Sequence, residues 1–185
     1  MNGHDILDLN LNFYRSQMGY VQQEPLLFLG TIRDNLTFGK RDATEGELDE
    51  AMRLSNSLNF IRDLPQGLDT VIGPLNLTQL SGGQRQRISL ARTLIRHPKM
   101  LILDEATLAL DLISEELVMR NLLMLNRDLG VTIINIAHRL STIRNSDRVI
   151  VFNQQGEVVE DGPFSELYGN PNSELNKLLK NHDLE

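Results

Sequence analysis

Apolar residues recur along the chain with two spacings, one typical of strands and one typical of helices. Short runs rich in β-branched and aliphatic residues predict strands at 18–22, 100–103, 131–137, 148–152 and 157–160. Three of these runs are apolar on both alternation phases, the pattern of strands that helices cover on both faces. We therefore expect an α/β fold built on a mostly parallel sheet.

Helical spacing fills the segments between these strands. The predicted helices begin near Thr44, Ser57, Gln84, Ser114 and Ser173. Thr44 and Glu47 have the spacing of a capping box. Pro98 ends the third helix, and Gly130 follows the fourth, where glycine is favoured just past a helix end. The region from about 44 to 97 is expected to be mainly helical.

Composition narrows the class of protein. At about 150 residues per domain, the 185 residues predict one domain, or one domain with an appendage, around one core. The 18 basic and 25 acidic residues leave a formal net charge of −7, which argues against a nucleic-acid partner. The chain has no cysteine, and its four histidines lack zinc-site spacing. Its apolar runs are too short to cross a membrane, and no secretory signal is present, so we expect a cytosolic chain.

A glycine pair stands at the start of the helix predicted from Gln84. The segment reads Leu80, Ser81, Gly82, Gly83, Gln84. Glycines at a helix start expose backbone N–H groups and let a ligand approach closely, while the helix dipole favours an anion. The segment therefore predicts an anion-binding helix start. A tight turn that only caps the helix is the alternative.

Two adjacent carboxylates follow the strand predicted at 100–103. Asp104 and Glu105 would lie at the carboxyl end of the sheet, where ligands bind in open α/β proteins. One carboxylate can hold Mg²⁺ while its neighbour orients or deprotonates an attacking water. An acidic pair that only caps the following helix is the alternative.

The order of these motifs resembles the nucleotide-binding domain of ABC transporters over almost the whole chain. Residues 80–84 resemble the family signature, 100–104 resemble its Walker B strand, and Glu105 resembles its catalytic glutamate. Single residues match further family motifs in the same order: Gln23 (Q-loop), Asp111 (D-loop) and His138 (switch histidine).

The resemblance implies a P-loop NTPase-like fold with a helical signature subdomain, and ATP and Mg²⁺ as cofactors. Glu105 would act as general base and Asp104 as a magnesium ligand. Gln23 would contact the magnesium ion and the attacking water, and His138 would contact the γ-phosphate. The signature residues 80–84 would cap ATP in trans, on a second nucleotide-binding domain.

The segment after Gln23 resembles the exporter branch of the family. Pro25 to Phe28 and Arg139 to Thr142 carry this likeness. It implies two partners, the transmembrane domain of an exporter and a second nucleotide-binding domain, identical or different. It also implies a location on the cytoplasmic side of a membrane. Residues 1–185 would form one partial ATP-binding domain, with 44–97 as the helical subdomain and 1–43 and 98–185 as the rest.

The P-loop motif G-x-x-x-x-G-K-[ST] does not occur in the sequence. Of the four lysines, only Lys40 follows a glycine, and Arg41 stands at the Ser/Thr position. We therefore expect a domain truncated before its first strand and inactive alone, with an exposed apolar sheet edge that favours dimers or aggregation. A non-catalytic module that caps or regulates an intact ABC domain is the alternative, and a soluble ABC ATPase outside transport is a third.

Two local departures from the family pattern are visible. Leu108 stands where exporters usually have serine in the D-loop, and residues 74–76 replace an acidic stretch before the signature. The leucine at 108 argues against the usual communication across a dimer, and the changed segment at 74–76 argues against the usual coupling to the membrane domain.

Overall fold

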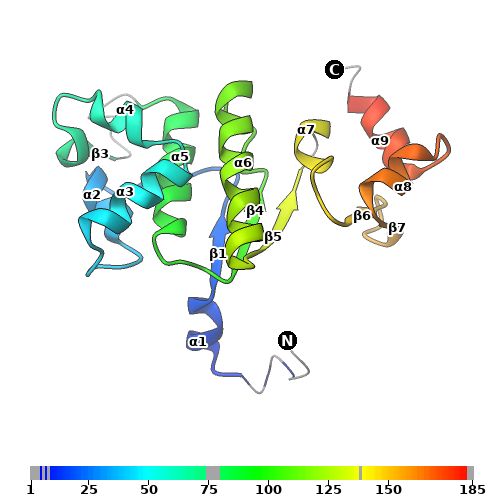
Figure 1. The fold of residues 1–185 in the computed structure, drawn as a ribbon, viewed down its shortest axis with the longest axis horizontal. Helices are drawn as coiled ribbons and strands as arrows, with labels where there is room; N and C mark the ends of the chain where they lie inside the picture. Colours follow the sequence, from blue (N-terminus) through cyan, green and yellow to red (C-terminus); the bar gives the residue numbers. More distant parts are fainter. Residues whose placement is uncertain (1–4, 6, 8, 74–79, 138, 183–185) are drawn as a thin grey trace. The chain divides into compact units, whose positions relative to one another are not determined.

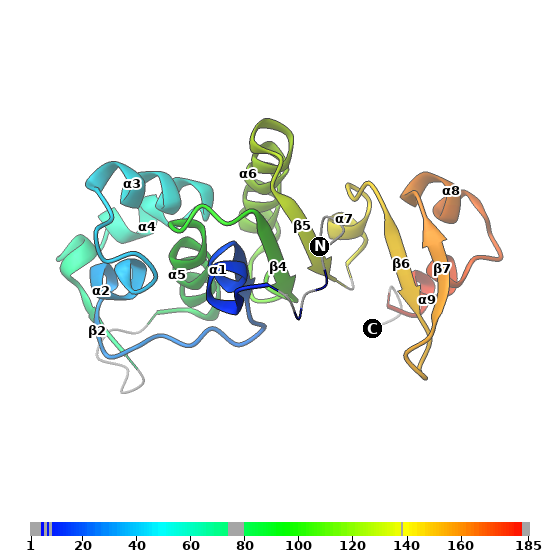
Figure 2. The same cartoon turned by 90° about the horizontal axis from the view of Figure 1, so that it is seen from below.

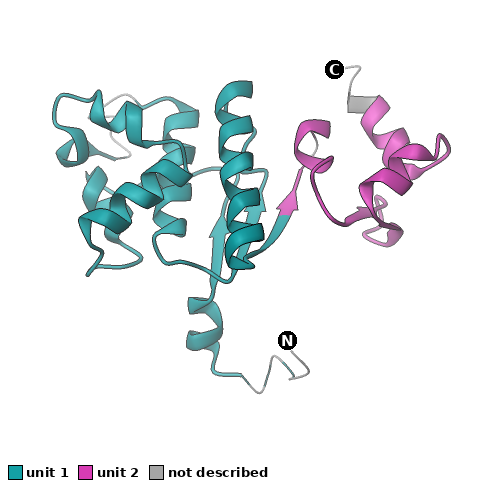
Figure 3. Cartoon of the chain, viewed as in Figure 1, with its two compact units in different colours: residues 1–134 teal, residues 135–185 magenta. Residues whose placement is uncertain are grey.

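The fold is taken from a computed structural model, which describes residues 5, 7, 9–73, 80–137 and 139–182. The chain divides into two units, residues 1–134 and 135–185 (Figure 3). Each unit is described by itself.

A three-stranded sheet organises the first unit. Its strands, in the order β1-β4-β5, are β1 (Met18–Val21), β4 (Met100–Asp104) and β5 (Thr132–Ile136), whose last residues belong to the second unit. β1 and β4 pair in parallel, with Met18 opposite Met100 and Val21 opposite Leu103. The structure thus confirms the α/β class and these three strands. Before β1 lies α1 (Leu11–Ser16), a short helix that the apolar pattern does not predict.

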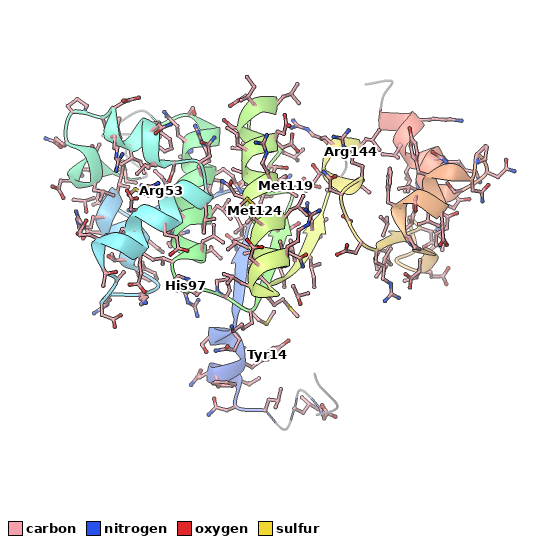
Figure 4. The ribbon with its side chains drawn as sticks, viewed as in Figure 1. Tyr14, Arg53, His97, Met119, Met124 and Arg144 are labelled. Atoms are coloured by element: carbon pink, nitrogen blue, oxygen red, sulfur yellow. The ribbon has the colours of Figure 1, made fainter. Side chains whose placement is uncertain are left out.

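Helix α6 (Leu112–Leu129) lies against one face of β4 (Figures 1 and 2). The cluster between them is fully apolar and includes Leu101, Leu103 and Leu122. Met119 faces this core with 9% of its surface exposed, whereas Met124, also on α6 in Figure 4, is 53% exposed. One apolar stripe therefore fixes this helix on the sheet.

A second apolar cluster holds the helical part of the first unit. Its elements are α2 (Ile32–Thr37), α3 (Glu45–Leu54), α4 (Leu58–Arg62), the 3₁₀ turn η2 (Gly67–Asp69) and α5 (Gly82–Leu94), with the two-residue strands β2 (Gly30–Thr31) and β3 (Val71–Ile72) paired antiparallel. Ile32, Leu36 and Ile88 are completely buried in this cluster. Helix α2 and both short strands are missing from the sequence prediction, because two residues are too few for the strand period and the six residues of α2 span less than two helical turns.

The predicted capping box of α3 is present. Thr44 Oγ1 accepts from the N–H of Glu47 at 3.3 Å, and the N–H of Thr44 donates to Glu47 Oε2 at 2.9 Å. Glu47 also forms an ion pair with Lys40, and His97 Nε2 lies 3.6 Å from Glu47 Oε1. The hydrogen bond from Lys40 and that from the Thr44 backbone lower the pKa of Glu47 to about 2.

This lowered pKa predicts an acid-sensitive contribution to stability. A carboxyl whose pKa is depressed in the folded state stabilises the fold above its ordinary pKa of 4.5 and loses that contribution as the pH falls toward 2. The melting temperature should therefore fall less steeply with acid in Glu47→Gln than in the unmodified chain. Circular dichroism melts between pH 6 and 2.5 measure this slope. Glu50→Gln, an exposed change on the same helix, is the control, and equal slopes for all three proteins would contradict the assignment.

The second unit is a small hairpin with helices. It contains α7 (Leu140–Ile143), the antiparallel strands β6 (Val149–Phe152) and β7 (Val158–Gly162), α8 (Phe164–Gly169) and α9 (Glu174–His182). Val151, Leu175 and Leu179 form its buried core. Both oxygens of Glu160 accept N–H groups at the start of α9, from residues 174 and 175, at 2.8 and 3.0 Å. The strands and the last helix agree with the sequence prediction, whereas α7 and α8 are too short for it.

No helix within the described residues combines the length and apolar character that crossing a bilayer requires.

Candidate functional site

The predicted carboxylates lie where the sequence places them, at the carboxyl end of β4. Asp104 is the last residue of this strand, and the hydroxyl of Tyr20 on β1 donates to Asp104 Oδ2 at 2.7 Å. This hydrogen bond raises the pKa of Tyr20. One oxygen of Asp104 is therefore held by the neighbouring strand, and no motif in the sequence predicts this contact.

Glu105 has an uncommon backbone conformation. Its φ is +48°, in the left-handed region that residues with a side chain seldom adopt. A backbone conformation of this kind costs free energy. It occurs most often at functional sites, where the surrounding structure stabilises it. The turn directly after β4 thus sets the direction in which the Glu105 carboxylate leaves the backbone.

The structure brings Gln23 to Glu105, although 82 positions separate them in the sequence. Gln23 Nε2 donates to Glu105 Oε2 at 2.5 Å, from the segment that follows β1. A hydrogen bond to a carboxylate is stronger than a neutral one. Since β1 and β4 are parallel neighbours, both residues leave the sheet at the same edge. Gln23, the predicted Q-loop residue, and Glu105, the predicted base, therefore form one local pair.

The signature segment forms the start of α5. Ser81 is the N-cap of this helix, and it forms a capping box with Gln84: Ser81 Oγ accepts from the N–H of Gln84 at 3.2 Å, and Gln84 Oε1 accepts from the N–H of Ser81 at 2.9 Å. Leu80 is 9% exposed and belongs to the helical cluster. Both polar side chains of the motif thus serve the helix, as the capping alternative predicts. The remaining N–H groups of the first turn have no partner within the helix.

The two glycines of the signature differ in the space around them. A Cβ added to Gly83 would lie 2.8 Å from the carbonyl oxygen of Ala109, whereas a Cβ on Gly82 would lie 3.7 Å from the Ala109 side chain. The first distance is a clash and the second an ordinary contact. Gly83 is therefore needed for the close approach of α5 to the segment between β4 and α6.

This difference predicts opposite effects of two similar substitutions. Gly83→Ala should destabilise the fold by about 1–3 kcal/mol, because the backbone carbonyl has to move. Gly82→Ala should be neutral or stabilising by up to about 1 kcal/mol, because alanine favours a helix over glycine. Urea unfolding of both variants, followed by circular dichroism, measures these values. Equal changes in the two proteins would show that the clearance at Gly83 is not limiting.

Asp111, the predicted D-loop residue, is the N-cap of α6. Its Oδ1 accepts from the N–H of Ser114 at 2.9 Å, so the helix begins at Leu112 and not after Ser114 as the sequence suggested. The hydrogen bonds from the Ser114 backbone and hydroxyl lower the pKa of Asp111, and the positive charge of Arg87 on α5 adds to this. Asp111 is therefore held in place as the cap of α6.

Several expectations lie outside the described residues, namely His138 and residues 74–76. Within the described ranges, no group of three or more Asp, Glu, His or Cys side chains could hold a metal ion. A Mg²⁺ ion needs fewer than three such side chains, since it binds one or two protein carboxylates together with phosphate and water oxygens. The oxygens of Asp104 and Gln23 fit this donor set.

A hollow elsewhere in the first unit is lined by Leu54, Leu94, His97, Pro98, Lys99, Leu125, Leu129 and Val131, none of which is a predicted site residue.

The parallel pairing of β1 with β4 and the helix α6 packed on this sheet define an α/β protein, with Asp104 at the carboxyl end of β4. Comparison with protein families matches residues 1–108 to the family described as "ABC transporter". The chain belongs to this family.

Known proteins resemble it along almost its whole length. The "ATP-dependent permease MDL1" of Candida albicans is 67% identical over 184 residues, which is 99% of this chain and 27% of that protein. The "ATP-dependent permease MDL1, mitochondrial" of Saccharomyces cerevisiae is 50% identical over 178 residues, 95% of this chain and 25% of that protein. This chain thus spans about a quarter of the length of these relatives.

A solved structure shares the fold. It is described as a bacterial Atm1-family ABC exporter with ATP bound, and it superimposes with a TM-score of 0.88 at 36% identity. The match covers 100% of this chain and 31% of the exporter chain. The P-loop NTPase-like fold and the relation to ABC exporters, both expected from the motifs, are confirmed.

Proposed function

We propose that this chain is part of the ATP-hydrolysing domain of a membrane exporter and that it couples ATP binding and hydrolysis to export. The observation that carries the proposal is the Gln23–Glu105 hydrogen bond of 2.5 Å at the carboxyl end of the sheet. It pairs a side-chain amide with a carboxylate where a nucleotide binds in this fold. The names of the relatives, permeases and exporters, support the transport role.

The residues take different parts in this reaction. The Glu105 carboxylate accepts a proton from the water that attacks the γ-phosphorus, and the Gln23 amide orients that water. The bond from the γ-phosphorus to its bridging oxygen breaks, which gives ADP and phosphate. Asp104 and Gln23 would hold Mg²⁺, which neutralises phosphate charge when it is bound with ATP. His138 would contact the γ-phosphate.

The phosphate-binding P-loop is not among these 185 residues. We propose that ATP is held by a polypeptide that carries one, and that residues 80–84 cap ATP on a second nucleotide-binding domain. Each hydrogen bond to a charged phosphate contributes about 1.5–3 kcal/mol, and micromolar binding totals only about 8 kcal/mol. The 185 residues alone should therefore neither bind ATP tightly nor hydrolyse it. The transmembrane domain of an exporter is the second proposed partner, and it would place the chain beside a membrane.

A chimaera tests the proposal. The segment of the Candida albicans permease that aligns with this chain, 184 residues at 67% identity, is exchanged for the chain itself. We expect the purified chimaera to hydrolyse ATP in the presence of Mg²⁺ and the 185-residue chain alone to show no hydrolysis. Hydrolysis by the chain alone would contradict the expected inactivity.

A folded but inactive chimaera would count against the hydrolase and leave the capping module as the alternative. That alternative has its own test. Ser81→Cys in this chain should form an ATP-dependent crosslink to a cysteine in the P-loop of an intact ABC domain. A crosslink without any activity of the chimaera would favour a regulatory module over a hydrolase.

A further inference from the structure

Gln86 lies one turn into α5 and connects this helix to the segment after β1. Its side chain is only 2% exposed, and its Nε2 donates to the carbonyl oxygen of Gln22 at 3.0 Å. The two residues are 64 positions apart in the sequence. The contact therefore joins the signature helix to the main chain directly before Gln23.

The hydrogen bond to the Gln22 carbonyl also restricts Gln23, because the two residues share a peptide bond. The carbonyl of Gln22 and the N–H of Gln23 belong to one planar peptide unit, and twisting this unit costs a large amount of energy. A hydrogen bond that fixes the carbonyl of Gln22 therefore also fixes the orientation of the backbone N–H of Gln23. From there the Gln23 amide reaches Glu105 Oε2 at 2.5 Å.

An amide at this buried position is costly. Gln86 Oε1 is buried and has no hydrogen-bond partner among the described residues. A buried polar atom left unpaired costs about 1–3 kcal/mol. Nearby positions of the same helix carry apolar residues, Ile88 and Leu90, with 0% and 4% exposure. An apolar residue would satisfy packing at position 86 equally well, so packing alone does not account for the glutamine.

We infer that Gln86 is a positioning residue, which holds the Gln22–Gln23 peptide so that the Gln23 amide meets Glu105. Its Nε2 donates to the carbonyl oxygen of Gln22, so its effect on Glu105 passes through Gln23. The importance of the contact for hydrolysis rests on the proposed function, but the contact itself does not. The signature helix and the predicted base are thereby connected through two hydrogen bonds in series.

The test uses nuclear magnetic resonance on the 185-residue chain without nucleotide. The side-chain amide signals of Gln23 are assigned by their loss in Gln23→Ala, and Glu105→Ala shows their position when the partner is missing. Gln86→Met keeps a similar length and removes the donor. We expect it to move the Gln23 signals from their original position to that seen in Glu105→Ala.

Ser89→Ala is the matched control, because Ser89 is a polar residue of the same helix with 4% exposure. It should leave the Gln23 signals in place. Unchanged Gln23 signals in Gln86→Met, or an equal movement in Ser89→Ala, would overturn the inference. Because no ATP is present, these outcomes do not depend on whether the chain takes part in hydrolysis.

Circular dichroism checks that each variant folds. If Gln86→Met unfolds, Gln86→Asn replaces it, since asparagine keeps the amide but is one methylene too short to reach the Gln22 carbonyl. It should give the same movement of the Gln23 signals. Unfolding of both variants would assign Gln86 to stability alone and reject the inference.

Discussion

Glu105→Gln in the chimaera is expected to lower the turnover number for ATP by at least about 100-fold, the usual contribution of a positioned general base. The amide keeps the size of the side chain, and its oxygen can still accept from Gln23 Nε2, which lies 2.5 Å from Glu105 Oε2. What is lost is the basic carboxylate that takes the proton. The KM for ATP should therefore change little, because binding contacts remain.

Steady-state hydrolysis with Mg²⁺-ATP measures both constants. Glu116→Gln is the control, since this glutamate is exposed on α6, where it pairs with Arg120 at 3.6 Å. It should leave turnover unchanged. A turnover number of Glu105→Gln within tenfold of the unmodified chimaera would remove Glu105 from the role of base.

Leu101→Ala is expected to destabilise the chain by about 2–5 kcal/mol, the range measured for buried leucines. Leu101 is 0% exposed and is the second residue of β4. Its surroundings are filled: a Cβ added to Gly19 on β1 would lie 3.1 Å from Leu101 Cδ1. The substitution therefore leaves a cavity beside β4, the strand that ends at Asp104.

Urea unfolding followed by circular dichroism measures this loss. Leu112→Ala removes the same atoms from a side chain that is 73% exposed at the start of α6. This control should change the free energy of unfolding by less than about 0.5 kcal/mol. A loss below 1 kcal/mol in Leu101→Ala would mean that this region of the sheet does not limit stability.

The sequence predicts those parts of the fold that repeat a pattern over enough residues. α6 has 18 residues, enough to repeat the helical period several times, and the five residues of β4 repeat the shorter strand period of two, so their type is clear from spacing alone. α2 has six residues, and its capping box, Thr31 with Asp34, gives only a short signal. The sequence predicts the start of α6 after Ser114 because Asp111 and Ser114 both suit a helix start, and only the hydrogen bond between them assigns the cap to Asp111.

The candidate site, too, is only partly predictable from the sequence. The order of the motifs and the family resemblance indicate Gln23, Asp104, Glu105 and Asp111, and the structure adds the hydrogen bond between Gln23 and Glu105. The φ of Glu105, the clearance at Gly83 and the buried bond of Gln86 are properties of three-dimensional packing between distant segments. No residue spacing encodes them. Tyr20 illustrates this limit, since in the sequence it is only an aromatic residue of a strand.

The capping box between Ser81 and Gln84 also bears on nucleotide selectivity. Both side chains bond to the helix backbone, so the start of α5 offers a ligand main-chain N–H groups. Such groups recognise the oxygens of any phosphate chain and make no distinction between adenine and guanine. Under the proposed function, this half of the site would accept ATP and GTP alike, and the choice of base would fall to the polypeptide that holds the nucleotide.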